Sequence, residues 1–133
     1  MTRERPPRSV YVVLPAYNEA GNVGAVLKAL ERTGVETGIQ FHAIVVDDGS
    51  SDPTAEIVRK YKGRIPCTLL VHAFNRGLGA TIRDGLLKAI EQADDGDVIV
   101  TMDADDTHTP GAIVDMVAKI DQGYDVLFGT ARQ

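Results

Sequence analysis

Residues 41–54 read Phe-His-Ala-Ile-Val-Val-Asp-Asp-Gly-Ser-Ser-Asp-Pro-Thr, and this stretch decides the fold. Its first six residues form a mostly apolar run, which predicts a strand buried on both faces of a sheet. The Asp-Asp-Gly-Ser that follows is typical of a loop. Asp52-Pro53 is typical of a helix start, with aspartate at the N-cap and proline in the first turn. The stretch therefore predicts a strand, a loop and a helix in succession, which is the repeating unit of α/β proteins.

The same unit recurs along the whole chain. Strands are expected at residues 10–14, 41–46, 68–72 and 98–102, with a fifth starting at 126–128. Amphipathic helices separate them, and the third, from about Ala80 to Gln92, is expected to bury Ile82, Leu86 and Ile90. Apolar strands alternating with helices predict a doubly wound α/β fold. Such a fold has a mostly parallel sheet between two helical layers, in a three-layer α/β/α arrangement.

Composition limits the organisation and the partners. The 133 residues (14.3 kDa, 44% apolar) suit one domain, and we expect residues 1–9 to be a flexible basic arm before a domain at residues 10–133. A net charge of −5 and a pI near 5.1 argue against a nucleic-acid partner. One cysteine, Cys67, excludes a disulfide within the chain, which favours a cytoplasmic location. No apolar run approaches the roughly 20 residues of a membrane span.

Polar clusters follow four of the predicted strands at the point where each ends. These clusters are Pro15-Ala16-Tyr17-Asn18-Glu19, Asp47-Asp48-Gly49-Ser50, Asn75-Arg76-Gly77-Leu78-Gly79 and Asp103-Ala104-Asp105. In a doubly wound sheet, ligands bind beyond the carboxyl ends of the strands. The sequence therefore predicts a binding site at this edge of the sheet.

The last of these clusters has the spacing of a metal site. Side chains alternate along an extended segment, so Asp103 and Asp105 project the same way, about 7 Å apart at Cα. Two such carboxylates can share a hard divalent cation with substrate phosphates. The alternative is that the acidic loop caps the following helix, as Asp106 and Thr107 before Pro110 can do. The other strand exits favour the metal interpretation.

Several nucleotide and catalytic motifs do not fit. A Walker A loop and a G-x-S-x-G elbow are absent from the sequence. Residues 77–82 begin like a dinucleotide fingerprint, but Ile82 stands where its last glycine belongs. His42 and His72 fall in predicted strands as structural residues, whereas His108 lies in the acidic loop. A phosphoacceptor receiver domain would need an acidic pair after the first strand and a lysine after the fifth, and the chain supplies neither.

The four clusters carry a family resemblance. Leu14–Glu19, Val46–Asp52, Asn75–Gly79 and Met102–Asp105 closely resemble family 2 glycosyltransferases with the GT-A fold. Within that family they look most like the dolichyl-phosphate mannosyltransferases and polyprenyl-phosphate glycosyltransferases. The resemblance covers nearly the whole chain, in order and at the family's spacing. It implies that the fold is the Rossmann-like, nucleotide-sugar-binding half of a GT-A enzyme.

The resemblance also implies roles for single residues. Pro15, Tyr17 and Glu19 would flank the nucleoside, Val46 and Asp48 would line the base pocket, and Asp103, Ala104 and Asp105 would hold metal and diphosphate. Asp105 is the expected catalytic residue, and Mg²⁺ or Mn²⁺ is the expected metal of Asp103 and Asp105. The chemistry agrees, because the carboxylate of Asp48 or Asp47 can accept a ring N–H of uracil or guanine. Tyr17 offers the base a flat apolar face.

Two positions depart from the family pattern, and two roles have simpler alternatives. Thr107 stands where the branch often has Gln or Ser as a further metal contact. The phosphate-binding arginine would be Arg132, although Gly129-Thr130-Ala131-Arg132 is one residue longer than the family's Gly-Ser-Arg. Arg76 can assist at the diphosphate or be an ordinary solvated arginine. Glu19 can equally be a charge favoured at a helix start.

The resemblance predicts a glycosyltransferase that uses a donor of the GDP-mannose or UDP-glucose type. The expected acceptor is a polyprenyl or dolichyl phosphate, with a glycan as the alternative, so the cytoplasmic membrane face is the expected setting. Peripheral membrane association and a homodimer are compatible with it. We expect the chain to be truncated before an acceptor-binding half. The alternatives are a nucleotide-sugar binding module without activity, and a nucleotidyltransferase, which would need a glycine-rich basic loop after the first strand.

Overall fold

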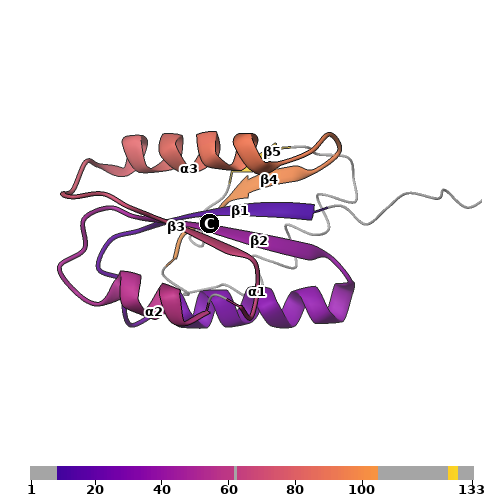
Figure 1. Cartoon of the computed structure of the whole chain (residues 1–133), viewed down its shortest axis with the longest axis horizontal. Helices are drawn as coiled ribbons and strands as arrows, with labels where there is room; N and C mark the ends of the chain where they lie inside the picture. The colour runs from indigo at the N-terminus through magenta and orange to yellow at the C-terminus, as the bar shows by residue number, and fades with distance from the viewer. Residues whose placement is uncertain (1–8, 62, 105–125, 129–133) are drawn as a thin grey trace, which may run out of the picture.

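The computed structural model describes residues 9–61, 63–104 and 126–128. Its elements, in chain order, are β1 (Ser9–Ala16), α1 (Val23–Thr37), β2 (Gln40–Asp47), α2 (Thr54–Tyr61), β3 (Cys67–Val71), α3 (Leu78–Gln92), β4 (Val98–Thr101) and β5 (Val126–Phe128). The strands form one parallel sheet in the order β3-β2-β1-β4-β5. Helices α1 and α2 cover one face and α3 covers the other (Figure 1). The predicted doubly wound, three-layer α/β/α fold is confirmed, with β1 starting at Ser9, inside the predicted arm.

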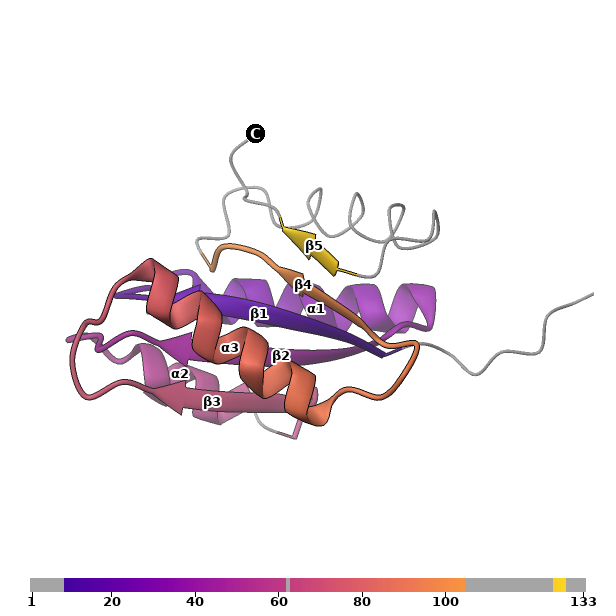
Figure 2. The same ribbon diagram turned by 90° about the horizontal axis from the view of Figure 1, so that it is seen from above.

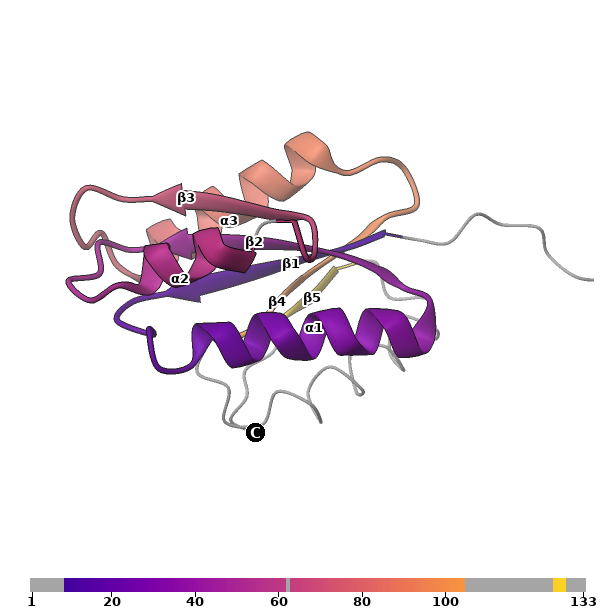
Figure 3. The same cartoon turned by 60° about the horizontal axis from the view of Figure 1, so that its bottom comes forward.

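Side chains on the two faces of the sheet alternate by residue parity. In β1, Val10, Val12 and Leu14 pack with the buried residues of α1, whereas Tyr11 and Val13 pack in a second cluster beneath α3. Strands β2 and β4 divide in the same way. The faces differ in helical cover, since α1 and α2 lie side by side on one face (Figure 3) and α3 crosses the other (Figure 2). Burial on both faces explains why the strands are almost wholly apolar.

Helix α3 packs through small residues, which corrects the sequence prediction. Its buried residues are Thr81, Gly85 and Ala89, whereas Ile90 is 63% exposed and Ile82 and Leu86 are half-buried. A Cβ added at Gly85 would lie 2.4 Å from Val13 Cγ1 and 3.1 Å from Val46 Cγ2. The helix backbone therefore lies too close to the sheet for large side chains. Sequence periodicity indicated the amphipathic helix but selected its larger apolar residues, which lie on the flank.

Strand β1 separates from β4 at Pro15. Pairing of β1 with β4 ends at Val13↔Thr101, apart from the bond from Met102 N to the Val13 carbonyl, while pairing with β2 continues to Ala16↔Asp47. Pro15 lies two residues beyond Val13, so its missing N–H falls on the β4 side of β1. The strand order also reverses between β1 and β4, which is where doubly wound folds bind ligands. The proline therefore ends β4 pairing at the crevice that the topology creates.

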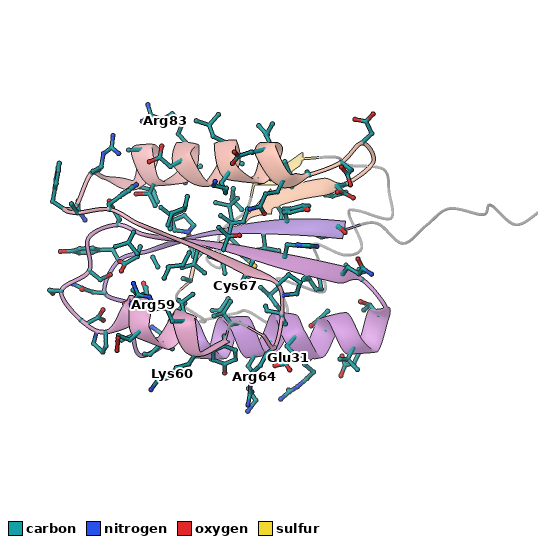
Figure 4. All side chains as sticks on the ribbon, in the orientation of Figure 1. Glu31, Arg59, Lys60, Arg64, Cys67 and Arg83 are labelled. Atoms are coloured by element: carbon teal, nitrogen blue, oxygen red, sulfur yellow. The ribbon has the colours of Figure 1, made fainter. Side chains whose placement is uncertain are left out.

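The outer faces of the helical layers carry charged side chains. Arg83 extends outward from α3, and Lys60 extends outward from α2 on the opposite side of the molecule (Figure 4). Cys67 is half-buried at the start of β3. Among the described residues, none of the helices combines the length and the apolar character that crossing a bilayer requires.

Candidate functional site

The loops that leave β1 and β2 are joined by side-chain hydrogen bonds. Asn18 adopts a left-handed conformation (φ 53°), and its Oδ1 accepts the N–H of Ser51 at 2.9 Å. In return, the N–H of Asn18 donates to Ser50 Oγ at 2.8 Å. Asp52 Oδ2 accepts the N–H of Ala20 at 3.0 Å, which ties the start of α2 to the same loop. These bonds hold the segment containing Tyr17 and Glu19 against the loop after β2.

The loops after β2 and β3 approach each other backbone to backbone. Gly49 has φ +76°, and a Cβ at this position would lie 2.5 Å from the Phe74 carbonyl carbon and 2.6 Å from Asn75 N. Only glycine combines this φ with so close a contact at low cost. The Asn75 Nδ2 also donates to the Asp48 carbonyl oxygen at 3.3 Å. The glycine of the Asp-Asp-Gly-Ser motif thus brings two strand exits together.

A cavity of about 330 Å³ opens at these strand exits. Its lining residues come from the ends of β1, β2 and β4, from the loop after β3 and from the first turn of α3: Pro15, Ala16, Tyr17, Glu19, Asp48, Asn75, Gly77, Leu78, Thr81, Asp103 and Ala104. The volume lies at the lower end of the range for small-molecule sites. The walls combine carboxylates, an aromatic ring that is 50% exposed at Tyr17, and backbone of the glycine turn.

The cavity contains six of the nine residues predicted from sequence: Pro15, Tyr17, Glu19, Asp48, Asp103 and Ala104. Val46 does not line it, because its side chain is fully buried against α3 with Val13 and Ile44. Asp105 and Arg132 lie outside the described residues, as does Thr107, the departure from the family's metal-contact position.

Asn75, Gly77, Leu78 and Thr81 line the cavity without having been predicted as site residues. The sequence marked residues 75–79 as a polar strand exit, which was the available signal for the first three. The sequence carried no such signal for Thr81. Its position at the cavity wall follows from how close α3 lies to the sheet.

The carboxylate of Asp48 is already engaged within the protein. Its Oδ1 accepts the N–H of Arg76 at 2.8 Å and lies 2.8 Å from His72 Nδ1, and its Oδ2 accepts the N–H of Gly77 at 3.0 Å. Burial alone would raise the pKa of Asp48. The hydrogen bonds from His72, Arg76, Gly77 and Thr81 outweigh burial and hold that pKa below its ordinary value. Asp48 is therefore an ionised group at the cavity wall.

His72 bridges two carboxylates. The sequence suggested that it lies inside a strand, but β3 ends one residue before it, at Val71. Its Nε2 lies 2.9 Å from Asp84 Oδ2, opposite the contact to Asp48. The hydrogen bonds to Asp48 and Asp84 raise the pKa of His72 despite its burial. Arg76 Nη1 lies 3.5 Å from the same Asp84 oxygen, so this arginine is part of an ion-pair network and does not line the cavity.

The acidic end of the cavity is described through Asp103. This residue is half-buried and lines the cavity beside Ala104. Within residues 9–61 and 63–104, no group of three or more His, Cys, Asp or Glu side chains converges as a metal site. The second carboxylate of the predicted pair, Asp105, falls outside these ranges. A single hard carboxylate at a cavity wall fits one ligand of a Mg²⁺ or Mn²⁺ ion that also binds substrate oxygens.

Known proteins are similar to this chain in sequence and in fold. The chain is 35% identical over 98% of its length to an undecaprenyl-phosphate 4-deoxy-4-formamido-L-arabinose transferase of Pseudomonas savastanoi, and 37% identical over 93% to the transferase of that name from Edwardsiella ictaluri. It spans 37% of the length of each relative. The crystal structure of S. aureus TarS 1-349 in complex with UDP-GlcNAc matches 86% of the chain at 26% identity (TM-score 0.64), through 31% of that protein.

A family model adds to these pairwise matches. The model for Glycosyl transferase family 2 matches residues 11–133, which include every residue that lines the cavity. The two relatives are 35% and 37% identical to this chain over 98% and 93% of its length. The chain therefore belongs to glycosyl transferase family 2.

Proposed function

We propose that this chain is the donor-binding part of a glycosyltransferase that moves a sugar from a nucleoside diphosphate sugar to an acceptor. The observation that carries the proposal is the cavity at the β1/β4 crevice of a family 2 chain. Its wall has an exposed aromatic ring at Tyr17 and carboxylates at Asp48 and Asp103. The ring suits a nucleobase, and the Asp103 carboxylate at the β4 exit suits a metal-bound diphosphate.

The nucleoside would lie at the β1 and β2 exits. The half-exposed ring of Tyr17 offers an apolar face for the base, with Pro15 and Glu19 beside it. Asp48, at the wall of the cavity, would accept a ring N–H of uracil or guanine. Glu19 Oε1 accepts Asn22 Nδ2 at 3.0 Å, so its carboxylate is held at the loop before α1.

The diphosphate would lie at the β4 exit, beside Asp103 and Ala104. Asp103 and Asp105 would hold Mg²⁺ or Mn²⁺, and Arg132 would contact phosphate. A bound divalent cation supplies charge neutralisation to the departing diphosphate. Asp105 is proposed as the catalytic residue through this role as a ligand. The donor set supports the assignment because carboxylate oxygens are the ligands that these hard cations prefer.

We propose a polyprenyl phosphate as the acceptor, since both transferases described above act, by name, on undecaprenyl phosphate. The phosphate oxygen of the acceptor would attack the anomeric carbon as the bond from that carbon to the diphosphate breaks. The nucleoside diphosphate leaves with the electron pair, and the configuration inverts. An anionic phosphate oxygen is already nucleophilic, so this step needs no general base. This acceptor would place the reaction at the cytoplasmic face of a membrane.

The test is a titration of the purified chain with GDP-mannose and UDP-glucose, with and without Mn²⁺, followed by an assay of transfer to a short polyprenyl phosphate. We expect binding that requires Mn²⁺ and that Asp103→Asn abolishes. Asp95→Asn is the matched control, because Asp95 is an exposed aspartate in the loop between α3 and β4. Failure of both sugar nucleotides to bind, along with GDP and UDP, would contradict the proposal.

A second candidate is a nucleotide-sugar binding module without transfer activity of its own. The observation that favours it is that the chain spans 37% of the length of the two transferases. The same titration and assay separate the candidates. Metal-dependent binding followed by transfer supports the enzyme, whereas metal-dependent binding without transfer supports the module.

A further inference from the structure

The ring of His72 joins three elements at the wall of the cavity. His72 lies one residue beyond β3, with 8% of its side chain exposed. Its Nδ1 is 2.8 Å from Asp48 Oδ1 at the β2 exit, and its Nε2 is 2.9 Å from Asp84 Oδ2 on α3. Ionised carboxylates only accept hydrogen bonds, so both ring nitrogens must donate. The ring is therefore an imidazolium that links the β2 exit, the β3 exit and α3.

Asp48 keeps little acceptor capacity beyond this arrangement. An ionised carboxylate offers about four acceptor positions. Three of these are taken by His72 Nδ1 and by the N–H groups of Arg76 and Gly77, and the Thr81 side chain is a further hydrogen-bond partner. Little acceptor capacity therefore remains for a ligand in the cavity that Asp48 lines. The direction in which the carboxylate faces that ligand depends on the contacts that orient it.

The neighbouring charges make His72 the counter-charge of Asp48. Arg76 Nη1 lies 3.5 Å and Arg83 Nε 3.6 Å from oxygens of Asp84, so both guanidinium groups contact the other carboxylate. Lys88 on the same face of α3 pairs with Glu91 at 2.7 Å. In the described part of the chain, His72 is thus the cationic side chain in contact with Asp48. Without it, a nearly buried carboxylate loses its partner charge.

We infer that His72 is a positioning residue of the donor site, which holds the Asp48 carboxylate and the Arg76-Gly77 turn in the orientation that receives the nucleobase. The inference rests on the proposed function for its ligand. It rests on geometry for its mechanism: the same carboxylate that lines the cavity also accepts the two turn amides. Asp84 in turn orients the ring through Nε2.

The inference predicts a pH dependence of donor binding. The hydrogen bonds to Asp48 and Asp84 raise the pKa of His72 above 6.5, against the effect of burial. Above that raised pKa the neutral ring has one N–H and loses one of its two contacts. Donor affinity should therefore be unaffected by this ring below pH 6.5 and fall as the pH rises through the raised pKa. Asp84→Asn removes one supporting charge, so the fall should begin at a lower pH.

Two substitutions of the ring separate positioning from simple packing. Asn at position 72 can place a side-chain N–H near the position of Nδ1 and donate to Asp48, whereas Leu fills the space without donating. We expect His72→Leu to weaken binding of UDP or GDP, whichever the unmodified chain binds, by roughly ten- to a hundredfold. His72→Asn should recover most of that loss and should show no fall above pH 6.5. Lys88→Gln is the control, because it removes a cation of α3 that pairs with Glu91 and does not contact His72, Asp48 or Asp84.

A ligand-free measurement keeps this test separate from the proposed function. Hydrogen exchange of the Arg76 and Gly77 amides is measured by NMR, with folding checked by circular dichroism. Faster exchange of both amides in folded His72→Leu, restored in His72→Asn, supports positioning whether or not a nucleotide binds. Unchanged exchange in folded His72→Leu overturns the inference. If the unmodified chain binds no nucleotide, the proposed function fails, and the amide result still decides the role of His72 in the turn.

Discussion

Helix α1 packs on one face of the sheet through Val23, Val26, Leu27 and Leu30, whereas α3 packs on the other face through Thr81, Gly85 and Ala89. On the first face, large aliphatic side chains separate helix and sheet. On the second, the helix backbone lies close to Val13 and Val46. The two faces are thus filled by different means, by side-chain volume under α1 and by close backbone approach under α3.

This difference matters because the cavity lies at the amino end of α3. Gly77, Leu78 and Thr81 line it, and Asp84 one turn further along α3 contacts His72. A helix held close to the sheet by small residues brings these groups to the strand exits. The α1 face supplies most of the buried apolar side chains, and the α3 face sets the geometry of the site. The two faces should therefore fail in different ways when they are changed.

The largest effect is expected on the α1 face. Leu27 is fully buried in the core cluster between α1 and the sheet, so Leu27→Ala should leave a cavity and lower the free energy of unfolding by about 2–5 kcal/mol. Chemical denaturation followed by circular dichroism measures it. Leu87 on α3 is 59% exposed, and Leu87→Ala should change stability by less than about 0.5 kcal/mol. Equal losses in the two variants would contradict the assignment of the core to the α1 face.

The next effect is overpacking on the α3 face. Gly85→Ala adds a Cβ 2.4 Å from Val13 Cγ1, and we expect it to cost about 1–3 kcal/mol despite the better helix propensity of alanine. Gly24→Ala on α1 is the matched control, because its added Cβ would meet Ile57 and Tyr61 at an ordinary 3.6 Å. That variant should be neutral or more stable by up to about 1 kcal/mol. A stabilising Gly85→Ala would show that α3 can move away from the sheet without cost.

The smallest effect is the pH dependence of stability that the α3-face network contributes. The pKa of His72 is raised from 6.5, so its contribution is complete below that value and is lost as pH rises through the raised pKa. The pKa of Asp48 is lowered from 3.8, so its contribution is present above 3.8 and is lost as pH falls further. Stability from this pair should therefore be greatest between about pH 3.8 and 6.5.

Thermal unfolding across pH measures this dependence. The stability lost on either side of the optimum should correspond to one hydrogen bond, about 1 kcal/mol. His72→Asn should flatten the decline above pH 6.5 and leave the acid side in place. His42, whose pKa is lowered by burial, acts in the opposite sense and loses its contribution as pH falls below 6.5. The variant separates the two histidines. An alkaline decline that persists in His72→Asn would assign it to another group.

Local pattern predicted the elements well, and tertiary packing explains where it failed. The strand and helix order follows from apolar runs and turn residues, and Asp52 accepts the Thr54 N–H at 3.0 Å at the predicted start of α2. Val46 is adjacent to the Asp-Asp pair, but alternation along β2 turns its side chain into the core beneath α3. The bridging role of His72 was not predicted, because its partners are 24 and 12 residues away in the sequence.

Residue pattern alone was enough to predict a doubly wound parallel sheet and a polar site at its strand exits, because buried strands need apolar residues and parallel strands end on one edge. The distance between α3 and the sheet, and the contacts between loops, follow only from the tertiary structure. Gly85 allows α3 to lie close to Val13, Gly49 allows two loop backbones to meet, and the resulting proximity makes Asp48 part of a hydrogen-bonded network. The spacing of residues along the chain does not reveal how closely two distant segments approach in space. Such contacts therefore follow from the assembled structure alone.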